Sequence, residues 1–379
     1  MKTNDQVLDL SVDLQKEAYD WKKDIIINKV KFIEEVDKAL KDKEVTSLRK
    51  KVYFISTVVN YPKNDDIGLR NIGTNGDTVV LKKGSLLEEL NQIQEAQTIE
   101  RARYYLERLK KGITEIKTSK INDINLNRWK EYTEILTDSL WILDKRDDSG
   151  AHCAGYWGNF IPQIPHQLMM RYTKKGELVV DTFLGSGTTL IECKRLGRNG
   201  IGIELNPEVT RNADQLIKKE SNPHDVKTEI ITADSRHVDL KEILDKQGVK
   251  KVQLIIMHPP YHDIIRFSRS PNDLSNAGTV EEFIKMFCDV VDNTTPYLDM
   301  GRYLGIVIGD KYSKSEWIPL GFYIMNEILK RGFLLKSIIV KNFEETRGKR
   351  NQKELWRYRA LVGGFYIFKH EYILLFKKG

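Results

Sequence analysis

Residues 179–207, VVDTFLGSGTTLIECKRLGRNGIGIELNP, place a glycine-rich turn and a helical pattern between two short apolar runs. The first run ends at Asp181, and Gly185 and Gly187 follow in the turn. Glycine lets a backbone turn tightly and approach a ligand closely. The second run ends at Glu204, whose carboxylate can accept hydrogen bonds from both hydroxyls of a ribose. The stretch therefore predicts a strand–turn–helix–strand unit that holds a nucleoside.

The residues after the turn argue against a phosphate ligand. A phosphate-binding loop needs lysine after its last glycine, and Thr188 stands there. A dinucleotide fingerprint needs a third glycine three residues later, where the chain has Leu190. A nucleoside without phosphates suits the pattern better, and a plain structural turn is the alternative.

The rest of the chain from about residue 150 repeats the alternation of short apolar runs and helical stretches. Such alternation predicts a Rossmann-like α/β fold with a doubly wound, mostly parallel sheet. The final stretch, 365–378, is expected to be an antiparallel strand at the edge of the sheet. The other strands are expected at 177–183, 200–205, 228–234, 252–258, 303–309 and 335–342.

The first 150 residues have a different texture and are predicted to form a mainly helical region, with a second domain at 151–379. Residues 25–43 and 85–113 show apolar residues three and four apart among many charges, which indicates amphipathic helices. The second of these could be a hairpin arm, a dimer contact or, more simply, a helix packed on its own domain. Residues 60–80 are rich in turn formers and predict a loop or small hairpin.

Composition narrows the class of protein. Residues 1–150 carry 27 basic and 27 acidic residues, so the whole net charge of +7 belongs to the remainder, which favours a polyanionic partner. The sequence has no long apolar run and no secretory signal, and we expect a cytoplasmic protein. The three cysteines lie far apart without a CxxC pair, so neither a disulfide framework nor a metal site is expected.

A second motif lies in IIMHPPYHDIIRFS, residues 255–268. An apolar run ends at His258-Pro259-Pro260-Tyr261, at the carboxyl edge of the expected sheet, where such folds bind ligands. An exocyclic amine of a base is a poor nucleophile because its lone pair is delocalised into the ring. Two hydrogen-bond acceptors localise that lone pair, and a neutral His258 and the Pro259 carbonyl could supply them. Tyr261 could offer a flat face to an extruded base.

These two motifs together resemble those of the DNA amino-methyltransferases, over residues 155–379. The first motif of that family usually reads DPFxGSGTT, and Thr182 replaces its proline here. The second usually begins with Asp, Asn or Ser, where this chain has His258. The resemblance implies a class I methyltransferase fold, S-adenosylmethionine as cofactor and DNA as partner. It implies methyl transfer to the exocyclic amine of adenine or cytosine by His258, Pro259, Pro260 and Tyr261.

The resemblance also implies which residues contact the cofactor. The segment that begins GNFIP would pack on the methionine part, Glu204 would hold the ribose and Asp234 would lie beside the adenine. Core packing is the alternative for Phe160 and Phe183. The full set of implied cofactor residues is Phe160, Ile161, Pro162, Asp181, Phe183, Gly185, Ser186, Gly187, Thr188, Thr189, Glu204 and Asp234.

Two basic segments are candidates for nucleic-acid contact, with a solvated charged surface as the alternative. One follows the second motif and contains Arg266 and Arg269; the other, within 341–359, contains Arg347, Lys349 and Arg350.

Competing hypotheses are an RNA base methyltransferase, a protein-glutamine methyltransferase (whose motif begins with Asn) and a non-catalytic nucleic-acid-binding relative. The sequence leaves open whether a cognate restriction enzyme is a partner. The role of the first 150 residues, as a target-recognition or dimer-contact region, is also open.

Overall fold

The computed structural model describes residues 23–61, 65–73, 77–153, 155–156, 158–343 and 353–379. The chain divides into two compact units. The first comprises residues up to 119 together with 124–133, and the second comprises 120–123 and 134–379. The expected boundary at 150 is therefore too late, because residues 134–150 pack with the second unit.

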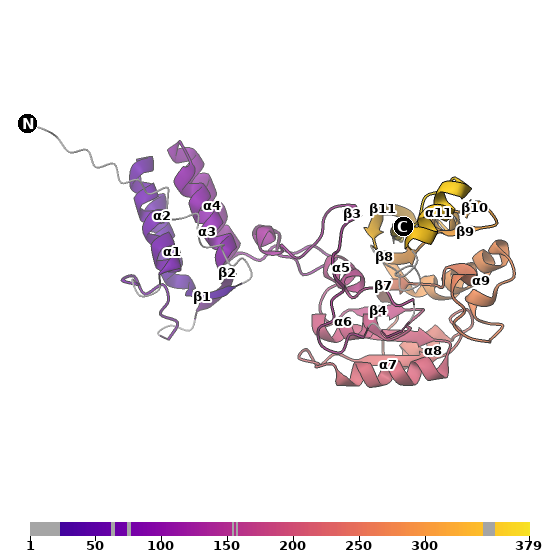
Figure 1. Ribbon diagram of the computed structural model, residues 1–379. Coiled ribbons are helices and arrows are strands. Elements are labelled where there is room, and N and C mark those ends of the chain that lie inside the picture. Colours follow the sequence, from indigo (N-terminus) through magenta and orange to yellow (C-terminus); the bar gives the residue numbers. More distant parts are fainter. Residues whose placement is uncertain (1–22, 62–64, 74–76, 154, 157, 344–352) are drawn as a thin grey trace, which may run out of the picture. The chain divides into compact units, whose positions relative to one another are not determined.

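The N-terminal unit packs helices on a two-stranded antiparallel sheet (Figure 1). Its core contains Ile25 and Ile27 from the sheet and Phe32, Leu48 and Leu90 from the helices. The isoleucine run at 25–27 was expected to be helical, but it forms a strand that pairs with 78–82. The elements are β1 (Asp24–Asn28), α1 (Lys29–Leu40), α2 (Val45–Asn60), β2 (Thr78–Lys82), α3 (Lys83–Glu95), α4 (Ile99–Thr114) and a 3₁₀ helix at Leu126–Glu131.

The C-terminal unit is built on an eight-stranded sheet with the order β3-β11-β12-β8-β7-β4-β5-β6. Neighbouring strands from β8 to β6 are parallel, as are β3 and β11, while β12 runs antiparallel to both of its neighbours. The strands are β3 (Leu140–Trp141), β4 (Leu178–Asp181), β5 (Asn199–Glu204), β6 (Thr228–Thr232), β7 (Val252–Met257), β8 (Leu298–Ile308), β11 (Leu334–Asn342) and β12 (His370–Lys377).

Helices cover both faces of this sheet, because its central strands are apolar on both sides. On β4, Val179 packs toward α5, α6 and α7, whereas Val180 packs toward α8, α9 and α10. This is the doubly wound, mostly parallel arrangement that the sequence predicted. The helices are α5 (Gln163–Tyr172), α6 (Thr188–Leu196), α7 (Pro207–Lys219), α8 (Leu240–Lys246), α9 (Val280–Thr294), α10 (Leu320–Lys330) and α11 (Lys353–Gly363).

The sheet has a topological switch point between the neighbouring strands β4 and β7. The chain goes from β4 to β5 on one side and later returns to β7 on the other, so β4 and β7 are neighbours whose following loops diverge. Ligands bind at such a switch point, outside the carboxyl ends of the strands.

The final strand is antiparallel as expected, but its position differs. β12 lies between β8 and β11 and not at the edge, which β3 occupies. A small hairpin, β9 (Lys311–Ser313) with β10 (Glu316–Ile318), follows β8. None of the helices in the described part of the chain combines the length and apolarity that a bilayer crossing requires.

Candidate active site

A cavity that is open to solvent lies at the carboxyl ends of β4, β5 and β7. It brings together segments from both sequence motifs. The predicted residues that line it are Phe160, Phe183, Gly185, Glu204, Asp234, His258, Pro259 and Pro260.

The glycine-rich turn joins β4 to α6 through two residues with left-handed backbone angles. Gly185 has φ of 54° and Gly187 has φ of 85°, conformations that favour glycine. A Cβ atom on Gly185 would lie 3.1 Å from the ring of Tyr156, which lines the cavity. A Cβ atom on Gly187 would instead lie 2.8 Å from Ile217 Cδ1 on α7. Only Gly185 therefore faces the cavity, while Gly187 allows α6 and α7 to pack closely.

Glu204 forms part of the cavity wall and also holds the turn in place. Its Oε2 accepts a hydrogen bond from the Gly185 N–H at 2.9 Å, and its Oε1 accepts one from the Asn206 N–H at 2.9 Å. Each carboxylate oxygen has a second lone pair, which leaves acceptor capacity for a ligand. Burial raises the pKa of Glu204, although the two backbone hydrogen bonds oppose that shift.

Asp181 lies behind the turn and does not line the cavity. Its side chain accepts hydrogen bonds from the Phe183 N–H at 2.9 Å and from the Thr189 hydroxyl. Burial raises the pKa of Asp181 to about 6 despite these hydrogen bonds. Its role in this structure is to shape the turn.

Asp234 lines the cavity, but its carboxylate is already engaged. Arg236 donates to it from the backbone N–H at 2.9 Å and from the guanidinium, with Nη2 at 2.7 Å from Oδ2. Burial alone would raise the pKa of Asp234, but the hydrogen bonds from Arg236 lower it overall.

The second motif follows β7 directly. His258, Pro259 and Pro260 line the cavity, and the His258 ring meets the Phe160 ring edge-on, with centroids 4.9 Å apart. Tyr261 does not line it. Its ring fills the space beside Gly309, where a Cβ atom would lie 2.7 Å from Cε2, and its hydroxyl donates to Glu371 Oε2 at 2.9 Å. The free stacking face expected of Tyr261 is therefore absent in this conformation, because the ring is packed beside β8.

The remaining predicted residues that the structure describes do not line the cavity. Arg266 and Arg269 are exposed on the loop after the second motif. Arg347, Lys349 and Arg350 fall outside the described residues. Those that support the turn or its surroundings without lining the cavity are Ile161, Pro162, Asp181, Ser186, Gly187, Thr188 and Thr189.

Several lining residues were not anticipated from the sequence. Tyr156 and Phe267 stack at 6.0 Å between ring centroids, and Asn159 accepts a hydrogen bond from the Thr188 hydroxyl at 2.8 Å. The aromatic run GYWGNF at 155–160 was the available signal for this wall. Asp273 also lines the cavity, from a loop without any recognisable motif.

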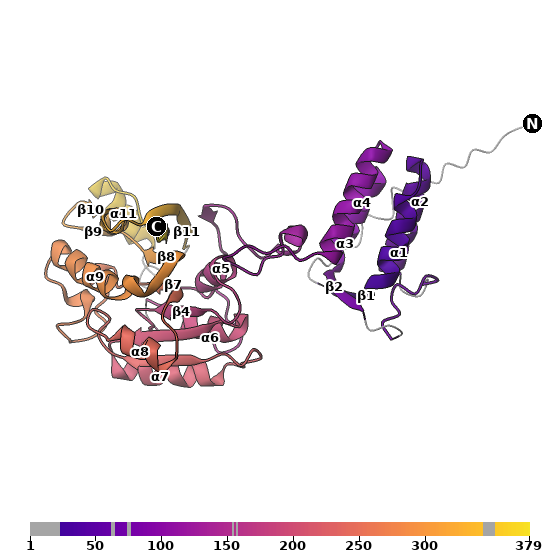
Figure 2. The same cartoon turned by 180° about the vertical axis from the view of Figure 1, so that it is seen from behind.

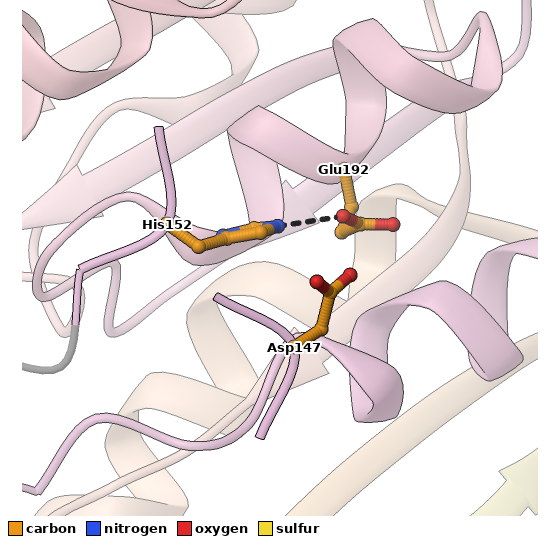
Figure 3. Close-up of side chains that lie close together, drawn as sticks. All are labelled: Asp147, His152 and Glu192. Carbon is orange, nitrogen blue, oxygen red and sulfur yellow. Dashed lines mark hydrogen bonds and ion pairs between the residues drawn. The ribbon is translucent and has the colours of Figure 1, made fainter. Parts of the chain in front are cut away.

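A separate cluster on the α5–α6 side joins Asp147, His152 and Glu192, which Figure 3 shows facing one another. The Glu192 carboxylate forms hydrogen bonds with His152 Nε2 at 2.7 Å and with His166 Nδ1 at 2.8 Å. Burial alone would raise the pKa of Glu192, but the imidazole hydrogen bonds lower it overall. The guanidinium of Arg195 already lies 3.4 Å from both carboxylates. We therefore interpret the cluster as a charge network that fastens residues 147–152 to α6.

The cavity wall suits S-adenosylmethionine, which joins a nucleoside to a sulfonium cation. Among the described residues that line it there are three carboxylates, those of Glu204, Asp234 and Asp273, and no lysine or arginine. Aromatic rings such as Phe160 add faces that attract a cation. A phosphate-bearing ligand would meet only negative charge here.

Comparisons with known proteins agree with this description. Residues 22–215, slightly more than half of the chain, match the sequence model of the DNA methylase family. The match ends before His258, so the second motif lies beyond it.

Individual relatives align over shorter stretches. Type II methyltransferase M.MjaII of Methanocaldococcus jannaschii is 44% identical over 52 residues, 14% of this chain and 10% of the relative. Type II methyltransferase M.XycI of Xanthomonas campestris pv. cyanopsidis is 38% identical over 85 residues, 22% of this chain and 27% of the relative. A tRNA (guanine(10)-N2)-dimethyltransferase of M. jannaschii is 28% identical over 128 residues, 32% of this chain and 36% of the relative. The chain thus spans between a tenth and about a third of these curated relatives.

Among solved structures, an rRNA methylase from Streptococcus thermophilus aligns with a TM-score of 0.34 and 12% identity, covering 57% of this chain and 94% of that protein.

Proposed function

Because the chain belongs to the DNA methylase family, we propose that it transfers a methyl group to the exocyclic amine of adenine or cytosine in DNA. Its cofactor is S-adenosylmethionine. One observation carries the proposal: the glycine-rich turn with Glu204 and the His258-Pro259-Pro260 segment line the same cavity, at the ends of neighbouring strands. A cofactor held by the first would thus lie beside an amine held by the second.

The chain's part in the reaction is positioning and electrostatics. S-adenosylmethionine supplies, when bound, a methyl group on a positively charged sulfur. The target base turns out of the duplex into the cavity, and its amine donates hydrogen bonds to the His258 ring and the Pro259 carbonyl. Held in this way, the amine would present a localised lone pair to the methyl group of the bound cofactor, and His258 or water would take the proton that the nitrogen releases on transfer.

The DNA would approach across the carboxyl edge of the sheet. The β9–β10 hairpin and α11 both lie at this edge, since they follow the carboxyl ends of β8 and β11 (Figures 1 and 2). The hairpin contacts the segment that follows α11 through aromatic rings, Tyr312 with Phe365 at 4.2 Å and Trp317 with Phe368 at 4.1 Å between centroids. Arg357 and Arg359 on α11 are exposed and can reach phosphates, as can Arg266 and Arg269.

Transfer of a radiolabelled methyl group tests the proposal directly. The protein and labelled S-adenosylmethionine are incubated with duplex DNA, with tRNA and rRNA, and with a protein extract, and the modified DNA bases are identified by mass spectrometry. Label in N6-methyladenine or N4-methylcytosine is the expected result, lost in the His258→Ala variant. Label in RNA alone would favour the alternative suggested by the tRNA-methyltransferase relative, and cofactor binding without any transfer would favour a non-catalytic protein. Resistance of the modified DNA to a restriction endonuclease from the same host would identify the proposed partner enzyme.

A further inference from the structure

His258 stands at one end of a series of polar side chains that neither motif predicted. The series is half-buried at His258 and Tyr261 and buried at Glu371 and Lys341. His258 Nε2 lies 3.1 Å from the Tyr261 hydroxyl, and that hydroxyl lies 2.9 Å from Glu371 Oε2. Glu371 Oε1 lies 3.0 Å from Lys341 Nζ. The side chains of Lys341 and Glu371 are 7% and 11% exposed, so this ion pair is largely shielded from solvent.

The sheet topology creates this chain of contacts. Lys341 on β11 and Glu371 on β12 are direct cross-strand partners in the antiparallel register. Because β12 is antiparallel, its first residues lie at the same edge as the carboxyl ends of β7 and β8. Glu371 is thereby brought to the His258–Tyr261 segment from 110 residues away in the chain.

The direction of each hydrogen bond follows from the charged carboxylate of Glu371 at one end of this series of contacts. A carboxylate can only accept, so the Tyr261 hydroxyl donates its single hydrogen to Glu371. The opposite orientation would turn a hydroxyl lone pair toward a carboxylate oxygen 2.9 Å away. With its hydrogen engaged, the Tyr261 oxygen can only accept from His258. The proton of the neutral imidazole therefore lies on Nε2.

This assignment leaves Nδ1 of His258 without a proton. Nδ1 forms no hydrogen bond within the described residues, and the ring lines the cavity. The charged groups that act on the ring are Glu371 and Lys341, whose effects oppose each other, and burial lowers the pKa of His258 to about 4. The ring thus stays neutral near pH 7 and presents one acceptor.

We propose that Glu371, held by Lys341 and acting through the Tyr261 hydroxyl, fixes His258 in the Nε2–H tautomer, so that Nδ1 accepts a hydrogen bond from the target amine. The second half of this statement rests on the proposed function. Glu371, Lys341 and Tyr261 are positioning residues in this scheme, and His258 is the group that touches the substrate. These hydrogen bonds explain how a histidine can replace an acidic or amide side chain at this position, since they leave Nδ1 of the ring as a defined acceptor.

The tautomer can be measured without any substrate. The full-length protein is labelled with ¹⁵N-histidine, and the His258 nitrogens are assigned among the seven histidines by comparison with His258→Asn. At pH 7 we expect a protonated Nε2 and an unprotonated Nδ1. Tyr261→Phe removes the acceptor for Nε2–H and should shift both resonances toward a mixture of tautomers. Tyr372→Phe is the matched control, because its hydroxyl contacts His370 Nε2 at 3.1 Å and Asp310 at 3.3 Å and neither of the His258 partners, and it should leave the His258 resonances unchanged.

Activity supplies the second readout. The Tyr261→Phe variant should lower kcat about fivefold or more, since an unsatisfied buried donor strongly disfavours the required tautomer, while the Kd for S-adenosylmethionine stays unchanged. Glu371→Gln should shift the tautomer in the same direction, because a neutral amide lets the Tyr261 hydroxyl turn toward His258. A protonated Nδ1 in the wild-type protein, or an unchanged nitrogen pattern in Tyr261→Phe, would overturn the proposal. The expected pattern in a wild-type protein that methylates no DNA would overturn the proposed function alone and leave the tautomer assignment standing.

Discussion

At the scale of single residues, Glu204 combines two tasks, because its carboxylate both fixes the Gly185 turn and faces the cavity. We predict that Glu204→Ala weakens S-adenosylmethionine binding by about 1.5–3 kcal/mol, which is about ten- to a hundredfold, through the loss of a charged acceptor. Isothermal titration calorimetry measures the change. Glu229→Ala on β6 is the control, since this exposed carboxylate binds Gln247 away from the cavity. Equal affinities in a folded Glu204→Ala variant would remove Glu204 from the binding site.

His258 determines the expected response to acid. An ordinary imidazole would titrate near pH 6.5 and would place an acid limb of activity there. Burial lowers the pKa of His258 to about 4, so the neutral acceptor persists as pH falls until that value is approached. We predict that protonation of His258 does not affect kcat between pH 5.5 and 8 and that it lowers kcat as the pH falls toward 4.

Variants of His258 distinguish the effect of its titration from that of Asp181, whose pKa of about 6 lies within this pH range. His258→Asn should abolish the limb near pH 4, because an amide does not titrate, and should retain part of the activity through its side-chain carbonyl, while His258→Ala should be much slower. A wild-type limb in kcat near pH 6.5 that disappears in His258→Asn would contradict the neutral imidazole.

How far single residues could be predicted depends on whether their partners are local. Glu204 and Gly185 could be placed at one site from the sequence because strand, turn and strand are contiguous, and both line the cavity. The inward packing of Tyr261 could not be predicted, since its partner Glu371 lies on the last strand and carries no motif. The orientation of Gly187 toward Ile217 likewise depends on how α7 packs, which a turn motif does not specify.

At the scale of elements, the contact between the turn and α7 is testable at Gly187. Alanine there must adopt a φ of 85° and place its Cβ against Ile217, so we predict that Gly187→Ala lowers the free energy of unfolding by about 1–3 kcal/mol. Ile217→Val removes the opposing Cδ1 atom, so the double variant should lose less stability than the sum of the single ones. Urea denaturation measures all three.

Cofactor affinity distinguishes Gly187 from Gly185. The folded Gly187→Ala variant should bind S-adenosylmethionine normally, whereas Gly185→Ala should weaken binding because its Cβ presses on Tyr156 in the cavity wall. Weak binding by Gly187→Ala at full stability would return that glycine to the cofactor site.

A second element, α11, is expected to contact DNA. Arg357 and Arg359 are exposed there, and Arg359 lies 5.3 Å from the ring centroid of Trp356. We predict that replacing both arginines with alanine reduces the slope of log K against log salt for DNA binding by about 0.9 for each phosphate that the variant no longer neutralises. Replacing Lys218 and Lys219 at the far end of α7 is the matched control and should leave the slope unchanged. An unchanged slope in the α11 variant would place the DNA on another surface.

Short apolar runs predicted the central strands β4, β5 and β7 well, because their residues are mostly buried on both faces. Periodicity failed at 25–27, where an isoleucine strand runs directly into α1 and the combined segment keeps a helical spacing of apolar residues. It also could not place β12, since direction and position in a sheet depend on pairing with β8 and β11 and not on local pattern.

At the scale of the whole molecule, each unit has a hydrophobic core of its own. The N-terminal core gathers residues between Ile25 and Ile113, and the C-terminal cores begin at Trp141. The change of texture near residue 150 located this division only approximately, because the segment 134–150 carries β3 and the Asp147 network without an apolar pattern of its own. Two cores of this kind favour unfolding in two steps.

Calorimetry of the full-length protein tests this independence. We predict two unfolding transitions. S-adenosylmethionine should raise the Tm of only one of them, because all residues of the cavity belong to the C-terminal unit. At a hundred times Kd the ligand contributes about 2.7 kcal/mol. For a unit of this size that corresponds to a rise in Tm of about 5–10 °C.

The complementary variant is Leu90→Ala in the N-terminal core, where Leu90 is fully buried. It should destabilise by about 2–5 kcal/mol and lower only the transition that the ligand leaves unchanged. A single transition, or a cofactor-induced shift of both, would mean that the two cores are energetically coupled. In that case the N-terminal unit would contribute to the stability of the body that binds the cofactor.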